Sequence, residues 1–298
     1  MFFEPPIFLI ELSNNVNIVD VCPLAEPVLG FEPKNKELAD RLGLTRWYKT
    51  NTIPPLNDNR IIKIEMDTMG GISPVYVSNR EKINNLSDLS PNDPLWVASK
   101  LWNIYNFGQI VLIDPGKALI YGPGIIDMDV DGSPSWDFMY YSVSPTPIIA
   151  IVDSGINDNR DLNVLWNLSW NTIVNLGGQS NVIDTCNHGT HVAGIAAGRF
   201  NNNYGTIGIF PDAYIMPIKV LDGCSGNQTD CAEGVIWAAD HNADVVNMSL
   251  QYGFSPISFF VSAVEYAKQA GTVCVAASGN FAQPNPSVPA NIPNVIGV

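Results

Sequence analysis

The chain has 298 residues, enough for one large domain or two smaller ones with a sizeable core. Apolar residues make up 46% of it and charged residues 15%, a balance typical of an ordered globular protein and not of a disordered one. The net charge of −14 argues against binding to nucleic acids or anionic membranes, because both attract a basic surface. No apolar run is long enough to span a bilayer, and residues 1–6 lack the basic start of a signal peptide.

The chain contains an odd number of cysteines, at positions 22, 186, 224, 231 and 274. An odd number argues against a complete disulfide framework. Cys224 and Cys231 are close enough in sequence to form a disulfide in an oxidising compartment, and two free, partly buried thiols are the favoured alternative. Cys186 lies two residues before His188, and groups this close in sequence seldom face each other as a catalytic Cys–His pair.

The first third of the chain predicts a small α+β unit. Residues 1–30 show no clear period and predict no element. Residues 36–43 predict a helix that ends at Gly43, and residues 45–49 and 61–66 predict strands. Residues 87–94 are polar and rich in turn-forming residues, which indicates a linker. We therefore expect an N-terminal region over residues 1–91 and a second domain over residues 92–298.

The second domain predicts strands and helices in alternation. Strands are expected at residues 147–152, 213–220, 243–250, 272–277 and 294–298, and helices after His188 and at residues 231–241 and 256–269. This order favours βαβ units and a parallel sheet with helices on its faces. In such sheets functional residues gather at the carboxyl ends of the strands, where Asp153, Ser249 and Asn280 fall.

The segment His188-Gly189-Thr190-His191-Val192-Ala193-Gly194 places a histidine at the mouth of a helix rich in small residues. Histidine is the most common general base near neutral pH. The segment resembles the His motif of the subtilisin-like serine proteases, or subtilases. Residues 151–156, Ile-Val-Asp-Ser-Gly-Ile, resemble the Asp motif of the same family, and the order Asp before His is that of the subtilisin type. A zinc site on His188 and His191 is disfavoured, because zincins space two histidines four apart with a Glu between them.

The resemblance implies a three-layer α/β fold and a division of roles among residues. Asp153 would orient His188, and Asn280, in the stretch Ala276–Asn280, would donate to the oxyanion. Ser249 and Leu250, with Gly279, would bind the substrate backbone as an added strand. The family usually has Gly after Ser-Leu, whereas this chain has Gln251, which leaves the shape of the specificity pockets open.

The nucleophile of the family lies in a Gly-Thr-Ser motif, and no such tripeptide occurs in this chain. We expect the nucleophilic Ser beyond residue 298, with the chain as given being an inactive fragment of a serine endopeptidase and its sheet incomplete. A non-catalytic peptide-binding relative that ends here is the alternative. It is disfavoured because a binding module has no use for a base and an oxyanion donor.

Residues 200–208 resemble the calcium loop of subtilisins. The matching ligands are the carbonyls of Phe200, Tyr204 and Thr206 and the side chains of Asn202 and Asp161, all oxygen donors as Ca²⁺ prefers. A polar surface turn is the alternative. The ion would be structural, and the chemistry itself would need no cofactor.

Segments of the first 137 residues resemble the propeptide and the start of the mature domain in this family. Residues 43–49 are similar to a stretch of bacterial subtilisin propeptides, and residues 90–96 to the junction before the mature domain. Residues 127–130 and 135–137 resemble the segment that leads into the first core strand. The resemblance implies a secreted enzyme that acts on polypeptides, with residues 1–91 as its own intramolecular inhibitor and folding chaperone.

Overall fold

The computed structural model of the chain describes residues 6–71, 91–98, 101, 110–114, 120–123, 145–280 and 282–298. The predicted linker start at residues 87–90 and the segments 127–130 and 135–137 lie outside these residues. Within them, β6 (Ile110–Asp114) and β7 (Ile120–Pro123) pair antiparallel.

A seven-stranded parallel sheet forms the centre of the molecule, in the order β10-β11-β8-β13-β14-β15 with β9 also pairing with β11. The strands are β8 (Ile148–Asp153), β9 (Asn163–Val164), β10 (Trp170–Asn171), β11 (Tyr214–Lys219), β13 (Val245–Met248), β14 (Val273–Ala276) and β15 (Val295–Gly297). The five strands predicted for the second domain are confirmed, and the short β9 and β10 are additional. Asp153 and Met248 end neighbouring strands, so their successors meet at one edge of the sheet.

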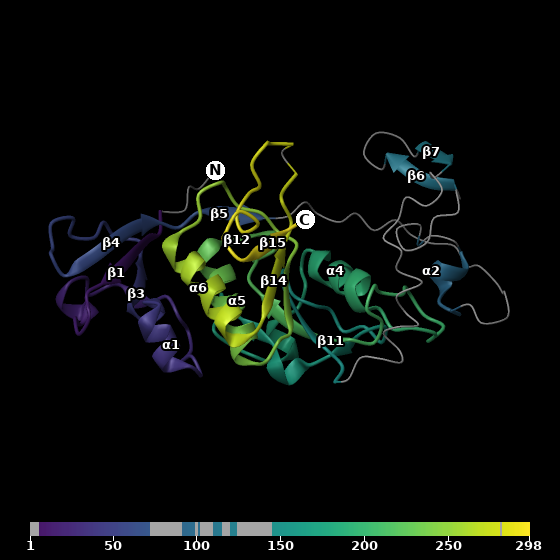
Figure 1. The fold of residues 1–298 in the computed structure, drawn as a ribbon, viewed down its shortest axis with the longest axis horizontal. Coiled ribbons are helices and arrows are strands. Elements are labelled where there is room, and N and C mark those ends of the chain that lie inside the picture. The colour runs from purple at the N-terminus through teal and green to yellow at the C-terminus, as the bar shows by residue number, and fades with distance from the viewer. Residues whose placement is uncertain are drawn as a thin grey trace.

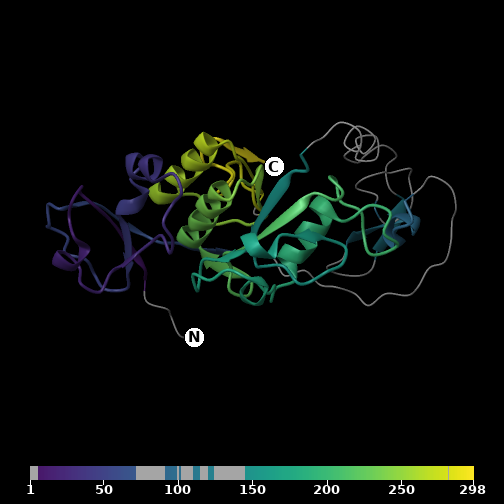
Figure 2. The ribbon, with the colours of Figure 1, turned by 90° about the horizontal axis from the view of Figure 1, so that it is seen from below.

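Helices cover both faces of this sheet. Figures 1 and 2 show α5 (Gln228–Asp240) and α6 (Ser258–Ala270) together on one face and α4 (His188–Ala197) on the other. The three-layer α/β fold is thus confirmed. The described part of the chain has two more α-helices, α1 (Lys36–Arg41) and α2 (Pro94–Val97), and single 3-10 turns at 18–20, 44–46, 166–168 and 179–181. None of the described helices is long and apolar enough to cross a membrane.

Alternate residues of the central strands supply two separate cores. Ala150 and Val152 of β8 belong to the large core beneath α5 and α6. Ile151 of β8 and Ile215 of β11 belong to a smaller core that contains Ala193 of α4. Because successive side chains of a strand point to opposite faces, the nearly continuous apolar run of β8 is what a strand buried on both faces requires.

The N-terminal unit, which we define as residues 6–71, has its own four-stranded antiparallel sheet in the order β2-β3-β1-β4. Its strands are β1 (Phe8–Leu12), β2 (Glu26–Pro27), β3 (Trp47–Thr50) and β4 (Ile61–Met66), with α1 between β2 and β3. The helix and the two predicted strands are confirmed. The sequence did not reveal β1, because Leu9 faces the large core while Ile10 and Leu12 face another, so the strand shows no polar alternation.

The N-terminal unit packs against α5 and α6 (Figure 1). Phe31 makes edge contacts with Trp170 and Trp237, and Trp47 does so with Phe259. Two carboxylates of the unit meet the helix N-termini: Glu65 accepts the backbone N–H of Ser258 at 2.9 Å, and Asp67 accepts the hydroxyl of Thr229. Carboxylates at these positions satisfy free N–H groups and complement the helix dipole.

One buried acid, Glu233, and one partly buried acid, Asp67, also line this contact. Glu233 of α5 is 1% exposed and accepts N–H groups from Gly30 and Trp170, each at 3.3 Å. Burial raises the pKa of the Glu233 carboxyl to about 8, against the lowering effect of the Trp170 hydrogen bond. Burial likewise raises the pKa of Asp67 to about 6. Burial therefore makes each acid harder to ionise than in water, although the hydrogen bonds from Thr229 oppose this effect at Asp67.

We expect the free energy of unfolding to decrease as the pH rises from about 4.5 to about 8, because the folded chain keeps a proton on Glu233 that the unfolded chain has lost. Glu233→Gln retains an acceptor but cannot ionise. It should therefore be more stable than the parent at pH 8.5 by on the order of 1–3 kcal/mol, with a much smaller difference at pH 4.5. Denaturant unfolding at both pH values measures this.

Glu37→Gln, at an exposed position on α1, is the matched control and should leave the pH dependence unchanged. If the free energy of unfolding of Glu233→Gln depended on pH as that of the parent does, Glu233 would not have the raised pKa given above.

Candidate active site

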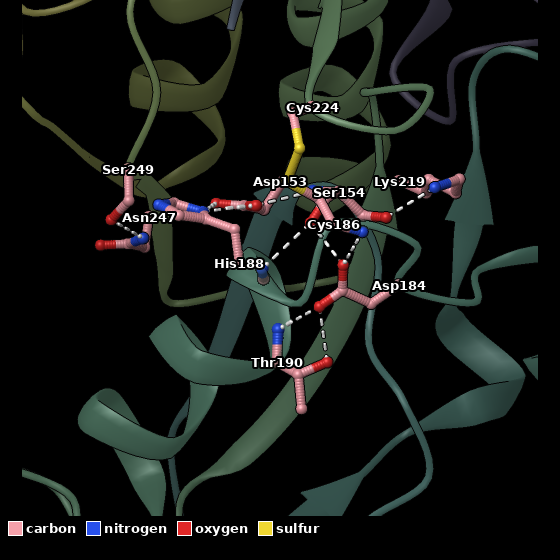
Figure 3. Close-up of polar contacts among 11 residues, drawn as sticks. Asp153, Ser154, Asp184, Cys186, His188, Thr190, Lys219, Cys224, Asn247 and Ser249 are labelled. Atoms are coloured by element: carbon pink, nitrogen blue, oxygen red, sulfur yellow. Dashed lines mark hydrogen bonds and ion pairs between the residues drawn. A yellow bond between two sulfur atoms is a disulfide. The ribbon is translucent and has the colours of Figure 1, made fainter. Parts of the chain in front are cut away.

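Asp153 and His188 form a close pair at the carboxyl end of β8. Asp153 is the last residue of the strand and His188 the first residue of α4. The His188 Nδ1 lies 2.8 Å from Asp153 Oδ1 and 2.9 Å from Oδ2 (Figure 3). Since the carboxylate only accepts, Nδ1 carries the proton and Nε2 is left as the basic nitrogen of the neutral ring. The Asp153 side chain has no exposed surface and that of His188 is 15% exposed, so the pair is buried on the Asp side and open on the His side.

A second carboxylate, Asp184, fixes the loops that carry this pair (Figure 3). Its Oδ1 accepts the Ser154 hydroxyl at 2.7 Å, and its Oδ2 accepts both the backbone N–H and the hydroxyl of Thr190, at 2.9 and 2.7 Å. Ser154 in turn accepts the N–H of Gly189 and donates its own N–H to Asp153 Oδ1. Asp184 and Ser154 therefore satisfy the free N–H groups at the start of α4 and tie that start to the turn after β8.

Lys219 is the buried cation of this region. It ends β11 directly beside Asp153 in the sheet register, is 7% exposed, and donates from Nζ to the Ser154 carbonyl at 2.6 Å. Burial lowers the pKa of Lys219, while the charges of Asp184, Asp222 and Asp153 raise it. The positive charge offsets part of the cost of burying two carboxylates.

Gly189 allows α4 to approach this turn. A Cβ at position 189 would lie 2.3 Å from the Gly155 carbonyl oxygen and 3.2 Å from Asp153 Cβ. A larger residue would push the helix, and with it His188, away from Asp153.

The disulfide of the chain joins Cys186 to Cys224, with a Cα–Cα distance of 5.4 Å. The predicted Cys224–Cys231 pairing is wrong, and so is the alternative in which both of these thiols are free. Cys231 lies inside the large core on α5, with its sulfur 3.9 Å from Met248, whereas Cys224 precedes β12 (Ser225–Asn227) on the side of the His188 loop. Free thiols among the described residues are Cys22, Cys231 and Cys274, all buried.

The residues expected to bind substrate lie beyond the neighbouring strands. Ser249 and Leu250 directly follow β13, and Ser249 Oγ accepts the Asn247 side-chain amide at 2.9 Å; in the view of Figure 3 this pair lies on the side of the imidazole away from Asp153. Asn280 and Gly279 lie on the turn after β14. Gln251, at the position where the family usually has Gly, accepts the backbone N–H of Asn280 at 2.8 Å and so joins the two segments.

A pocket opens beside this turn. It is lined by Phe254, Ser278, Gly279 and residues 282–287.

The predicted metal ligands gather around one loop. Asp161 accepts the Asn202 side-chain amide at 2.8 Å and the Thr206 N–H at 2.9 Å, and the Asn202 oxygen accepts the Tyr204 N–H at 2.9 Å. The structure also brings in Asp93, which accepts the N–H groups of Asn201 and Asn202. Burial raises the pKa of Asp93 and of Asp161, and the Asp161 charge adds to the effect on Asp93.

Sequence reasoning missed Asp93 and Asp184 as site residues. Asp93 lies more than 100 residues before the loop of residues 200–206, and no local sequence pattern predicts that the two segments are in contact. Asp184 lies three residues before the N-cap of α4, outside any local capping pattern, and it reaches the helix start only because the loop folds back. Among the described residues no three His, Cys, Asp or Glu side chains form a metal-binding group, so any cation here would depend largely on amide and carbonyl oxygens.

Asp184→Asn should destabilise the chain by about 1–3 kcal/mol, because an amide cannot accept all the hydrogen bonds that the carboxylate accepts and brings no charge to the helix start. Thermal unfolding measures the loss. Asp158→Asn, an exposed position in the same region, is the control and should change stability little. A loss in Asp184→Asn no greater than in the control would show that the network does not hold the site.

The sequence of this chain is similar to those of known proteases. The sequence profile of the subtilase family matches residues 144–298. Thermitase from Thermoactinomyces vulgaris is 38% identical over 180 residues, which cover 60% of this chain and 61% of thermitase. Subtilisin Savinase from Lederbergia lenta is 36% identical over 151 residues, which cover 50% of this chain and 54% of Savinase.

A solved protease structure from Pseudoalteromonas arctica is similar to this fold with a TM-score of 0.55 and 26% identity, covering 70% of this chain and 65% of its own. The chain therefore spans about three fifths or less of the two named relatives it matches. The family profile covers more than half of the chain and includes the Asp153 and His188 motifs. This chain belongs to the subtilase family.

Proposed function

We propose that the complete protein is a serine endopeptidase that cleaves peptide bonds through an Asp153–His188–Ser triad, with the nucleophilic Ser beyond residue 298. The observation that carries this proposal is the 2.8 Å contact between Asp153 and the Nδ1 of His188. Asp153 keeps the tautomer in which Nε2 is unprotonated and stabilises the imidazolium that forms when Nε2 takes the proton of the Ser hydroxyl. His188 then returns that proton to the leaving amine.

Substrate recognition falls to the segments after β13 and β14. We assign Ser249, Leu250 and Gly279 to binding of the substrate backbone and Asn280 to stabilising the oxyanion through its side-chain N–H. The hydrogen bond from the Asn280 backbone to Gln251 supports this assignment, because it fixes the oxyanion turn against the substrate segment. Donors held in place before the reaction stabilise developing charge without reorganisation.

Asp153→Asn and His188→Ala should each lower kcat of the complete protein on casein by about 10⁴, with KM little changed. Asp153→Asn loses activity because the amide stabilises the tautomer in which Nε2 carries the proton, and His188→Ala loses it because the general base is absent. His191→Ala, at an exposed position one helical turn later, is the control and should retain activity. Full activity in Asp153→Asn would overturn the proposed triad.

The alternative is a non-catalytic protein that binds peptides. No hydrolysis by the complete protein, together with binding of unfolded polypeptide that survives His188→Ala, would favour it.

We further propose that residues 1–91 act as a propeptide that inhibits the peptidase domain, residues 92–298, and assists its folding. Two observations support this. The N-terminal unit places Glu65 and Asp67 at the starts of α6 and α5. Its last described strand, β5 (Met69–Gly71), pairs with β12, which follows the cysteine bridged to the His188 loop.

We propose a structural calcium ion at the loop of residues 200–206. The oxygen donors there fit the ion: the carboxylates of Asp161 and Asp93, the Asn202 amide, and the carbonyls of Phe200, Tyr204 and Thr206. Two buried carboxylates whose pKa values are raised, one partly by the other's charge, are a site where a cation would relieve repulsion. The ion would hold residues 92–97 against this loop.

If this is correct, calcium at about 100 times its dissociation constant should stabilise the chain by about 2.7 kcal/mol, seen as a rise in Tm that a chelator reverses. Asp161→Asn should remove the response. Asp58→Asn, at a carboxylate that pairs with Arg60 in the N-terminal unit, should keep it. A calcium response that persists in Asp161→Asn would exclude this loop as the site.

We propose that the protein is secreted. The Cys186–Cys224 disulfide supports an oxidising compartment. A relative from Xanthomonas campestris, 31% identical over 201 residues, is named as an extracellular protease.

A further inference from the structure

The strand β5 is an extended segment that lies beside β12 (Figure 1). It runs antiparallel to β12, with Met69 opposite Asn227, Gly70 opposite Gly226 and Gly71 opposite Ser225. Cys224 directly precedes Ser225, the β12 residue opposite Gly71. Its disulfide partner, Cys186, lies two residues before His188. The described chain therefore runs toward the Asp153–His188 pair as far as Gly71, in the manner of a bound peptide.

Position 70 has no room for a side chain. A Cβ added at Gly70 would lie 2.1 Å from Tyr252 Cδ1 and 2.5 Å from the Gln251 carbonyl oxygen. Both distances are far inside van der Waals contact, which for carbon atoms is about 3.5–4.0 Å. The preceding residue differs, because Met69 is 57% exposed. A side chain is therefore excluded at position 70 but not at position 69, because successive residues of a strand point to opposite faces.

The wall that closes this position is fixed. Tyr252 is 2% exposed, its hydroxyl donates to the Asn227 carbonyl at 3.0 Å, and its backbone N–H donates to the Val288 carbonyl at 2.8 Å. The ring is therefore attached to β12 itself and to the segment beyond the oxyanion turn. The second obstacle, the Gln251 carbonyl, is backbone and cannot rotate away as a flexible side chain does.

We infer that Tyr252 makes this a glycine-selective subsite, so that the enzyme favours polypeptides with Gly at the residue that pairs with Gly226. The inference rests on the proposed peptidase function and names the substrate class of that site. The residue before this Gly, at the position of Met69, is left free to vary because its side chain points to solvent. Tyr252 is a specificity-determining residue and takes no part in the chemical step.

The first test uses the 298-residue chain and needs no catalysis. Gly70→Ala and Gly70→Leu should release β5 and speed hydrogen exchange of residues 225–227 by at least about tenfold, since overpacking a fixed wall is unfavourable. Met69→Leu is the matched control and should leave exchange unchanged. Ala and Leu favour strands more than Gly does, so faster exchange reports the clash and not a loss of strand propensity.

The second test measures selectivity directly. Gly70→Leu, with β5 released, is titrated with fluorescent peptides of the sequence of residues 63–71, carrying either Gly or Leu at position 70. The Gly peptide should bind at least about tenfold more tightly than the Leu peptide. Tyr252→Ala in the same background should lower this ratio by at least about threefold by removing the ring, while the Gln251 carbonyl keeps part of the preference for Gly.

Unchanged exchange in Gly70→Leu, or equal affinities of the two peptides including no binding of either, would overturn the inference. The exchange comparison between Gly70→Leu and Met69→Leu stands even where Tyr252→Ala does not fold. These results are separate from the proposed function, because they report binding alone. Loss of the peptidase assignment would show in the casein assay, with the Gly and Leu peptides still distinguished.

Discussion

Asp153 is a carboxylate with no exposed side-chain surface, and the protein alone must stabilise its charge. The backbone N–H of Ser154, the ring N–H of His188 and the nearby charge of Lys219 do so. Burial of an anion without such partners costs several kcal/mol. The rest of the site follows from this constraint: the helix that brings His188 must start within hydrogen-bond distance of the strand that ends at Asp153, and Gly189 together with Asp184 makes that start possible.

Three long-range links then hold the loops around this pair. The Cys186–Cys224 disulfide ties the His188 loop to β12. Gln251 ties the segment after β13 to the Asn280 turn, and Tyr252 ties the same segment to β12. A loop end that is fixed in this way can keep a bound peptide in one register, because the site loses little entropy when the peptide arrives. The same rigidity gives the wall at Gly70 its selectivity.

The contact between the N-terminal unit and helices α5 and α6 combines aromatic groups, whose burial is favourable at any pH, with acids whose ionisation is unfavourable there. Phe31 and Trp47 bury aromatic surface, which is favourable at any pH. Glu233 is buried and Asp67 is partly buried, and burial raises their pKa values to about 8 and about 6, which makes ionisation of either acid less favourable there than in water. An interface of this composition weakens as the pH rises, so the N-terminal unit is held more firmly in acid than at neutral pH.

The sequence by itself determined the elements and the chemistry carried by short motifs. The apolar run before Asp153, the small-residue helix after His188 and the alternation of strands and helices are local patterns, and each gave the element found in the structure. Only the tertiary structure decided which distant groups meet. Cys186 pairs with Cys224 and not Cys231 with Cys224, Asp93 returns to the loop at Asn202, and Gly70 lies against Tyr252. Periodicity reports the surroundings of a residue along its own element, whereas these contacts join segments 38 to 182 positions apart and depend on how whole elements pack.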